Sequence, residues 1–131
     1  MAVRVKNVIG TGILDGFQDE NLKSKYSSFM DFWEKQQQRG NNLSGNFCAN
    51  KCCNNSAAKD RNNDDEFVGA HVYIETDVCH NDIWYIVPMC KECNNSENNE
   101  TKFVDKSLLV KLPEEEVEAE KLAIMINELP M

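Results

Sequence analysis

The distribution of apolar side chains predicts three strands in the first ninety residues. Residues 3–9 are mainly apolar at intervals of two or three positions and lead into a glycine-rich turn. Residues 67–75 and 83–87 are rich in aromatic and β-branched residues, which favour strands. We expect residues 76–82 to form the loop of a hairpin, and Pro88 to end its second strand.

Helical spacing appears next to capping signals in two places. Ser28 and Asp31 form a capping-box-like start, followed by an aromatic face at helical spacing, Phe29, Phe32 and Trp33. Gly40 is expected to end this helix. After a further strand over residues 103–112, Pro113 opens an acidic helix that we expect to occupy residues 113–131. Five of its apolar residues are expected to form one broad docking face: Val117, Leu122, Ala123, Ile126 and Leu129.

Length and charge narrow the class of protein. A chain of 131 residues fits a single domain, which we expect to span residues 1–131. The net charge of −8 opposes binding of nucleic acid through its phosphates, since that binding depends on Lys and Arg. Acidic residues gather in the C-terminal helix, at Glu114, Glu115, Glu116, Glu118 and Glu120. They form either a solvated face, a surface for a basic partner or an imitation of nucleic acid.

The N-terminal sequence lacks the pattern of an export signal, and the chain contains no apolar run of 18 or more residues. We therefore expect a cytoplasmic protein that does not contact a membrane. The C-terminal helix, if it does not dock on its own domain, is expected to join two copies of the chain, so that the protein is a monomer or a homodimer.

Two close pairs of cysteines predict a metal site. Cys48 precedes Cys52 and Cys53 by four and five positions, and Cys90 precedes Cys93 by three. In a reducing compartment, two such pairs favour a closed Cys₄ zinc site over disulfides, although such sites also accept iron. Since Cys52 and Cys53 are neighbours, only one can easily be a ligand, and the spacing leaves both possible. Cys79 is expected to be a free thiol. The second pair is expected at a helix start, which stabilises thiolates.

The order of cysteine pair, hairpin and second cysteine pair is the outline of a treble clef. Within it, residues 69–72 read Gly-Ala-His-Val and residues 84–94 read Trp-Tyr-Ile-Val-Pro-Met-Cys-Lys-Glu-Cys-Asn. This segment resembles the ββα-metal core of the His-Asn-His (HNH) nucleases, over residues 47–95. Including residues 3–12 and 32–35, the chain also resembles a group of small HNH-like proteins. That resemblance implies an α+β treble clef stabilised by zinc, with a strand and helix added at each end and Cys48, Cys53, Cys90 and Cys93 as ligands.

The resemblance also implies a place for catalysis, and this chain departs from it. His71 matches the general base of an HNH nuclease, which activates water while a divalent ion stabilises the leaving oxygen. The position before the base is Ala70, which cannot bind a metal, and the family's asparagine aligns with Tyr85. Asp77, His80 and Asp82 are possible substitutes. As a structural residue, His71 would instead pack between the hairpin and a helix.

Three functions from different classes follow. The first is a zinc-stabilised HNH-like module that has lost catalysis and binds a protein or nucleic-acid partner. The second is a metal-dependent endonuclease with His71 as its general base, and polar side chains around His71 would favour it over an apolar shell. The third is an acidic imitation of nucleic acid that inhibits a nucleic-acid-binding enzyme.

Overall fold

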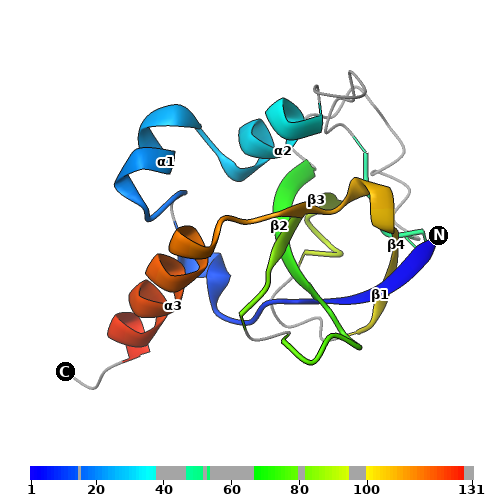
Figure 1. The fold of residues 1–131 in the computed structure, drawn as a ribbon. Coiled ribbons are helices and arrows are strands. Elements are labelled where there is room, and N and C mark those ends of the chain that lie inside the picture. The colour runs from blue at the N-terminus through cyan, green and yellow to red at the C-terminus, as the bar shows by residue number, and fades with distance from the viewer. Residues whose placement is uncertain are drawn as a thin grey trace.

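The structure is a computed structural model that describes residues 1–14, 16–37, 47–51, 53, 67–79, 82–94 and 100–128. These residues form an antiparallel sheet of five strands and three α-helices (Figure 1). The expected α+β class is confirmed. In chain order the elements are β1 (Ala2–Asn7), α1 (Glu20–Lys25), α2 (Phe29–Gln37), β2 (Phe67–Ile74), β3 (Tyr85–Cys90), β4 (Lys102–Asp105), β5 (Val110–Lys111) and α3 (Glu114–Glu128).

The sheet has the order β4-β1-β2-β3-β5, so the first strand of the chain lies inside it. β1 pairs with β2 and β4, which come much later in the sequence. The expected hairpin is confirmed as β2 and β3, whose register runs from Phe67 opposite Cys90 to Val72 opposite Tyr85. The hairpin therefore carries His71 in its first strand and ends at the second cysteine pair.

The strand expected over residues 103–112 is interrupted, and its two pieces lie at opposite edges of the sheet. β4 ends at Asp105, a short 3₁₀ helix follows at Lys106–Leu108, and β5 begins at Val110. Five residues span at most about 17 Å, whereas the edge strands of a flat five-stranded sheet lie roughly 19 Å apart. Since the 3₁₀ helix shortens the connection further, the sheet must curl, which brings its two edges together.

Pro88 lies inside β3 and does not end it, contrary to the expectation from sequence. It is opposite Gly69 of β2, and its carbonyl accepts a hydrogen bond from the backbone N–H of Ala49 at 2.8 Å. β5 pairs only with Tyr85 and Ile86, so no described strand lies beside the outer edge of β3 at Pro88. A proline is tolerated there because its missing N–H breaks no pairing between strands.

α2 begins as the sequence predicts and packs on the hairpin. Asp31 N donates to Ser28 Oγ at 3.0 Å, while the Asp31 carboxylate accepts from Ser27 N, which completes a capping arrangement. Phe32 and Trp33 are buried in an apolar cluster that also contains Trp84. The start of α2 crosses β2 at Gly69, where no side chain would fit. The expected end at Gly40 lies outside the described residues.

α3 begins at Glu114, close to the expected start, and residues 129–131 of the expected helix lie outside the described residues; its buried face agrees with the expected one only at Val117. Its buried side chains are Glu116, Val117 and Glu120, while Leu122 and Ile126, expected in the docking face, are exposed. The helix lies along one side of the molecule beyond α1 and β1, and its C-terminal half points away from the sheet (Figure 1). Ile124 packs on Gly10, whose positive φ of 95° and lack of a Cβ permit this contact.

No helix among the described residues combines the length and the apolar character needed to cross a membrane.

Candidate metal centre and the buried His71 site

Four cysteines converge in the structure although they are widely separated in the sequence. One sulfur from each of Cys48, Cys53, Cys90 and Cys93 lies within 4.8 Å of all the others. The Sγ atoms of Cys53 and Cys90 are 3.7 Å apart. Sulfurs on a tetrahedral zinc ion with bonds of about 2.3 Å are roughly 3.8 Å apart, so this spacing suits coordination by a single ion. The four residues could therefore bind a metal ion.

The loop that carries the first pair is held between the two edges of the curled sheet. Ala49 N donates to Pro88 O of β3, and Lys51 N donates to Phe103 O of β4, both at 2.8 Å. These bonds fix Cys48 and Cys53 opposite the second pair. Cys52, the alternative ligand, lies outside the described residues.

The second pair lies at the end of β3. Cys90 is the last residue of the strand, and residues 91–94 form a turn in which Asn94 N donates to Cys90 O at 3.0 Å. This bond has the i→i−4 spacing of a helical turn, and residues 95–99, over which the expected helix would continue, lie outside the described residues. Asn7 of β1 donates from its side chain to Cys93 O at 2.9 Å, which ties this turn to the middle of the sheet.

Burial and hydrogen bonding have opposite effects on the pKa values of the cysteine thiols. Burial raises the pKa of Cys48 and raises the pKa of Cys93 to about 11, whereas backbone N–H groups of Cys90 and Asn50 lower the pKa of Cys48. Asn50 Nδ2 also donates to Cys93 Sγ at 3.5 Å. A divalent ion would strongly favour the thiolate forms. The buried Lys102 ammonium interacts electrostatically with Cys93 and Cys48, and it would partly balance four thiolates around one ion.

Cys79 is separate from this cluster, as expected. It is exposed in the loop between β2 and β3, where its N–H donates to Asp77 Oδ1 at 2.9 Å.

His71 lies on β2 in a site that combines aromatic rings with carboxyl groups. Its side chain is 6% exposed, with Phe29 and Trp84 packed edge-on against the imidazole at centroid distances of 4.3 and 6.4 Å. Nε2 is 2.8 Å from Glu120 Oε1 of α3. The surroundings are therefore neither an apolar shell nor an open polar cleft, because a single carboxyl group covers the reactive nitrogen.

Glu116 and Glu120 of α3 are fully buried, and their surroundings change the pKa values of their carboxyl groups. Burial is the main cause that raises the pKa of Glu120 to about 7 and that of Glu116 to about 8, and the neighbouring Glu120 carboxyl also contributes to the raised pKa of Glu116. Burial lowers the pKa of His71 to about 4. Near neutral pH the lowered pKa of His71 favours a neutral imidazole.

Glu116 joins α3 to the start of α1. Its Oε1 accepts from Asp19 N at 2.7 Å, and both of its oxygens lie 3.0 Å from Gln18 N. Free N–H groups at a helix start are natural partners for a carboxylate. These donors lower the pKa of Glu116, although burial outweighs them. The two glutamates therefore attach α3 to β2 and to α1.

Sequence reasoning missed Glu116 and Glu120 as partners of His71. Their spacing of four residues places both on one face of a helix, but five glutamates in seven positions gave no sign of which two turn inward.

The described substitutes for the missing metal ligands, Asp77 and Asp82, do not form a second site. Among the described residues, the four cysteines are the only group of three or more His, Cys, Asp or Glu with ligand atoms close enough for one ion. Asp82 pairs with Lys121, and His80 lies outside the described residues. Ala70, which precedes His71 where the nuclease family has a metal ligand, is buried in β2 and has no side-chain atom that could bind a metal.

A cavity of about 240 Å³ adjoins His71 on the side of β1. Its polar lining comes from Asn7, Thr11 and Asn94, together with the imidazole. Asn7 Oδ1 is buried, and no hydrogen-bond donor of the described residues reaches it. The cavity is small and polar, as suits ordered water or a small polar molecule.

Comparison of the chain with protein-family models, with curated proteins and with solved structures finds no match.

Proposed function

We propose that this protein is a small zinc-stabilised binding module of HNH-like, treble-clef type in which catalysis has been lost. It works in a reducing compartment such as the cytoplasm, with Cys48, Cys53, Cys90 and Cys93 as zinc ligands. The zinc ion has a structural role, because four protein ligands leave no position for a substrate or water.

One observation carries this proposal. The cysteine cluster is the only group of side chains in the described part of the chain that is placed to hold a metal ion, and His71 does not belong to it. An HNH nuclease needs a divalent ion next to its general base. Here the base nitrogen is 2.8 Å from the buried Glu120, and both neighbouring rings pack against the imidazole. This arrangement suits a histidine that fastens α3 to the sheet.

The topology supports the relationship to treble clefs in part. A cysteine-bearing loop, a β-hairpin and a second cysteine pair at the end of the hairpin follow one another, as they do in that fold. The second pair is followed by a turn over residues 91–94, and residues 95–99 lie outside the described part. The HNH-like relationship therefore rests on the hairpin and on the motif around Cys90.

Elemental analysis tests the structural metal. Protein purified without chelator should contain one zinc ion per chain, and a variant with Cys90→Ser and Cys93→Ser should contain little. Cys79→Ser removes a thiol outside the cluster and should leave the metal content unchanged. Wild-type protein without bound metal, or with iron as its main metal, would contradict the proposed zinc centre.

A second candidate is a metal-dependent endonuclease, and the polar cavity beside His71 is the observation that favours it. Purified protein would be incubated with supercoiled plasmid and Mg²⁺, Mn²⁺ or Ni²⁺, with the His71→Ala variant in parallel. A binding module leaves the plasmid intact. Nicking by the wild type that disappears in His71→Ala would establish the nuclease and overturn the loss of catalysis.

The third candidate, an acidic imitation of nucleic acid, receives less support. Glu116 and Glu120 are fully buried and cannot present charge to an enzyme. A second group of acidic residues in the sequence, Asp60, Asp64, Asp65 and Glu66, lies outside the described residues. Among the described members of these two groups, only the exposed glutamates of α3 are left to imitate nucleic acid, and their position beside exposed apolar residues suits a protein partner better.

A further inference from the structure

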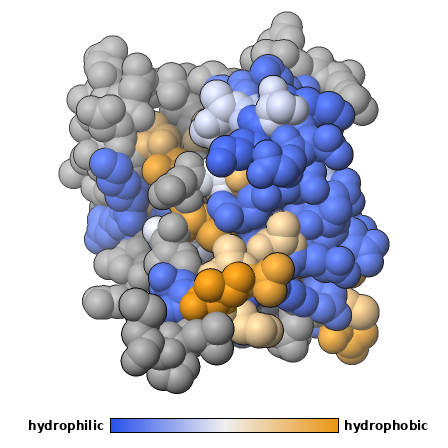
Figure 2. All heavy atoms as spheres, turned by 90° about the vertical axis from the view of Figure 1, so that its left-hand side faces the viewer, coloured by the Kyte–Doolittle hydropathy of each residue, from blue (hydrophilic) through white to orange (hydrophobic). Residues whose placement is uncertain are grey.

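The outward face of α3 combines acidic and apolar side chains in a fixed order. An α-helix turns by about 100° per residue, which places five side chains of α3 on one side of the helix. We call this set the outer stripe; it consists of Glu115, Glu118, Leu122, Met125 and Ile126. The first two are exposed glutamates. Leu122, Met125 and Ile126 are 56%, 60% and 58% exposed, and they follow one another at helical spacing. Figure 2, which views this side of the molecule, shows an apolar patch in the lower part of a largely hydrophilic face.

The exposure of these residues follows from the contacts of the opposite face. Glu120 is fastened to His71 and Glu116 to the start of α1, so the helix cannot rotate its apolar residues inward without breaking both contacts. Exposed apolar side chains at this spacing are typical of helices that pack against another helix. The outer stripe is thus held outward by buried carboxyl groups.

The charges beside the stripe indicate the chemistry of the partner. α3 contains six glutamates and a single basic residue, Lys121, which pairs with Asp82. Two parallel copies of α3 would bring the glutamates of both N-terminal halves together. Antiparallel copies would set Glu115 and Glu118 of each against the apolar half of the other. Neither arrangement offers them a cation. A second copy is therefore a poor match for this face.

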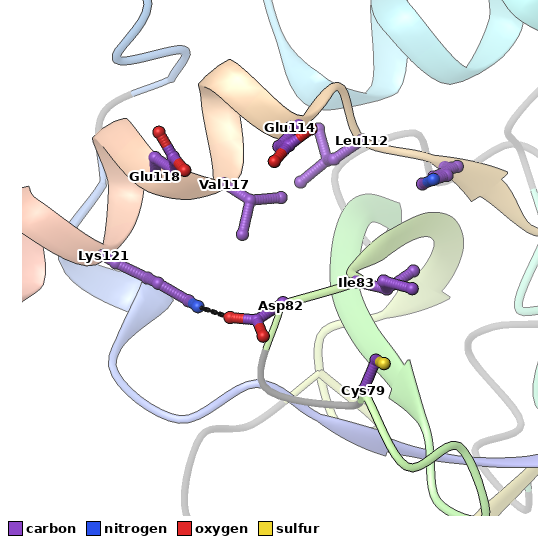
Figure 3. A pocket seen from close by; sticks show the side chains of 9 residues that line it. Cys79, Asp82, Ile83, Leu112, Glu114, Val117, Glu118 and Lys121 are labelled. Carbon is purple, nitrogen blue, oxygen red and sulfur yellow. Dashed lines mark hydrogen bonds and ion pairs between the residues drawn. The ribbon is translucent and has the colours of Figure 1, made fainter.

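A pocket of about 480 Å³ lies beside the stripe, between α3 and the loop before β3. Val117 points into it from α3, and Lys121 reaches across to Asp82 (Figure 3). Leu112 and Ile83 add apolar lining, while Glu114 and Glu118 contribute carboxylates and Lys111 a second ammonium. Because Lys121 already pairs with Asp82, the remaining charge is net negative. Apolar walls with an acidic rim suit the stem and head of a Lys or Arg side chain.

We propose that the outer stripe binds a basic amphipathic helix of another protein. The partner's apolar residues pack on Leu122, Met125 and Ile126. Its Lys or Arg residues pair with Glu115 and Glu118, and one of them enters the adjacent pocket. The inference rests on the proposed function, since it specifies the surface and the kind of partner of the binding module.

The test uses the full metal-loaded chain and a labelled peptide of about 14 residues, roughly four helical turns, built only of Leu and Lys at helical spacing. Fluorescence anisotropy should detect saturable binding. Leu122→Ser with Ile126→Ser should weaken it at least about tenfold, because both anchors of the stripe are lost. Glu118→Lys should weaken it about threefold or more, in keeping with a partly exposed ion pair.

Two variants serve as matched controls. Glu20→Lys makes the same charge change at an exposed position of α1, and Phe103→Ser removes an exposed apolar side chain from β4. Both should bind the peptide within about twofold of the wild type, since neither position belongs to the stripe. A peptide with Glu in place of every Lys should not bind. Circular dichroism and zinc content must match the wild type for every variant.

Three results would overturn the proposal: no binding of the Leu and Lys peptide, equal binding by the double serine variant, or equal binding of the Glu peptide. A wild-type dimer in sedimentation that the double serine variant dissociates would also overturn it, in favour of a second copy. These failures would leave a folded, zinc-loaded chain. A failure of the proposed function would instead appear as absent metal or as plasmid nicking that depends on His71.

Discussion

Gly69 sets the distance between α2 and the hairpin. A Cβ built at this position would be 2.8 Å from both Met30 N and Phe29 C, and 2.9 Å from Phe29 Cβ. Two of these atoms are backbone, so the clash cannot be relieved by rotating a side chain. Because Phe29 also packs on His71, the position of the imidazole depends on this glycine.

We expect Gly69→Ala to reduce the free energy of unfolding by about 1 to 3 kcal/mol, since α2 must move away from β2. Urea denaturation followed by circular dichroism measures the change. Gly12→Ala is the matched control, because its added Cβ meets no atom within 4 Å. Equal stability of the two variants would contradict the close approach of α2.

Cys53 is expected to be a ligand that no neighbour replaces. Cys53→Ser should remove the metal and cost about 3 kcal/mol or more, which lowers the melting temperature by roughly 10 °C. Cys52→Ser should be mild, and Cys79→Ser, which changes an exposed thiol, should match the wild type. Thermal melts with zinc analysis provide the measurement. A mild Cys53→Ser with a severe Cys52→Ser would assign the ligand to Cys52.

At the scale of elements, α3 shows what a sequence pattern can and cannot predict. Pro113 and the acids after it predicted the start of the helix correctly, because both signals are local. The buried face was predicted correctly at Val117 but not at Leu122 and Ile126, because a count of apolar residues assumes that glutamates point to solvent. Glu116 finds its donors 98 residues away, and no local pattern contains such partners. Pro88 was misjudged for a similar reason, since its tolerance depends on which edge of β3 is left unpaired.

The buried acids of α3 make stability depend on pH. Glu116 and Glu120 have pKa values of about 8 and about 7 in the fold, against 4.5 in the unfolded chain. The native state therefore holds more protons, and the free energy of unfolding falls as the pH rises through this range. His71, with a pKa lowered from 6.5 to about 4, acts in the opposite direction below pH 6.5. From there to pH 8 we expect a loss of roughly 1 kcal/mol per pH unit.

Urea denaturation at pH 6.5 and pH 8 measures this loss, with Glu120→Gln as the comparison. The amide does not titrate and still places a hydrogen-bond donor at His71, so the variant should lose less stability over the same interval. The thiols of the metal centre contribute the reverse trend, since zinc binds more tightly as they ionise, but they contribute equally to both proteins. Identical losses in the two proteins would exclude Glu120 as a source.

At the scale of the whole molecule, the cysteine loop joins the two edges of the curled sheet. The cysteine cluster was predictable in part: the close pairs indicated a metal site, but their spacing left Cys52 and Cys53 both possible, and only the resemblance selected Cys53. The order of the strands was not, since β1 pairs with residues 72–74 and 102–105, and nothing within residues 2–7 indicates those partners. The extra helix α1 was also missed. It is short, and one of the backbone N–H groups at its start, that of Asp19, donates to Glu116 near the other end of the chain.

Removal of the metal is therefore expected to affect the whole fold. Trp33 and Trp84 belong to the apolar cluster between α2 and the hairpin, and Phe47 of the cysteine loop packs on Trp33 with ring centroids 5.8 Å apart. A zinc chelator should shift tryptophan emission to longer wavelength, and added zinc should reverse the shift, because metal binding contributes directly to folding. Unchanged emission after verified loss of metal would mean that the centre stabilises only its own loop.

The position of β1 has a consequence for how the chain folds as it is made. This strand is synthesised before both of its neighbours, which are β2 on one side and β4, about a hundred residues later, on the other. Pairing between such distant segments is slow, because a long loop must close before any contact offsets its entropy. Until Lys102–Asp105 emerge, Val3 and Val5 have an open edge beside them. Completion of the sheet therefore waits until β4 has been made, and a nascent chain halted before β4 should be a target for chaperones.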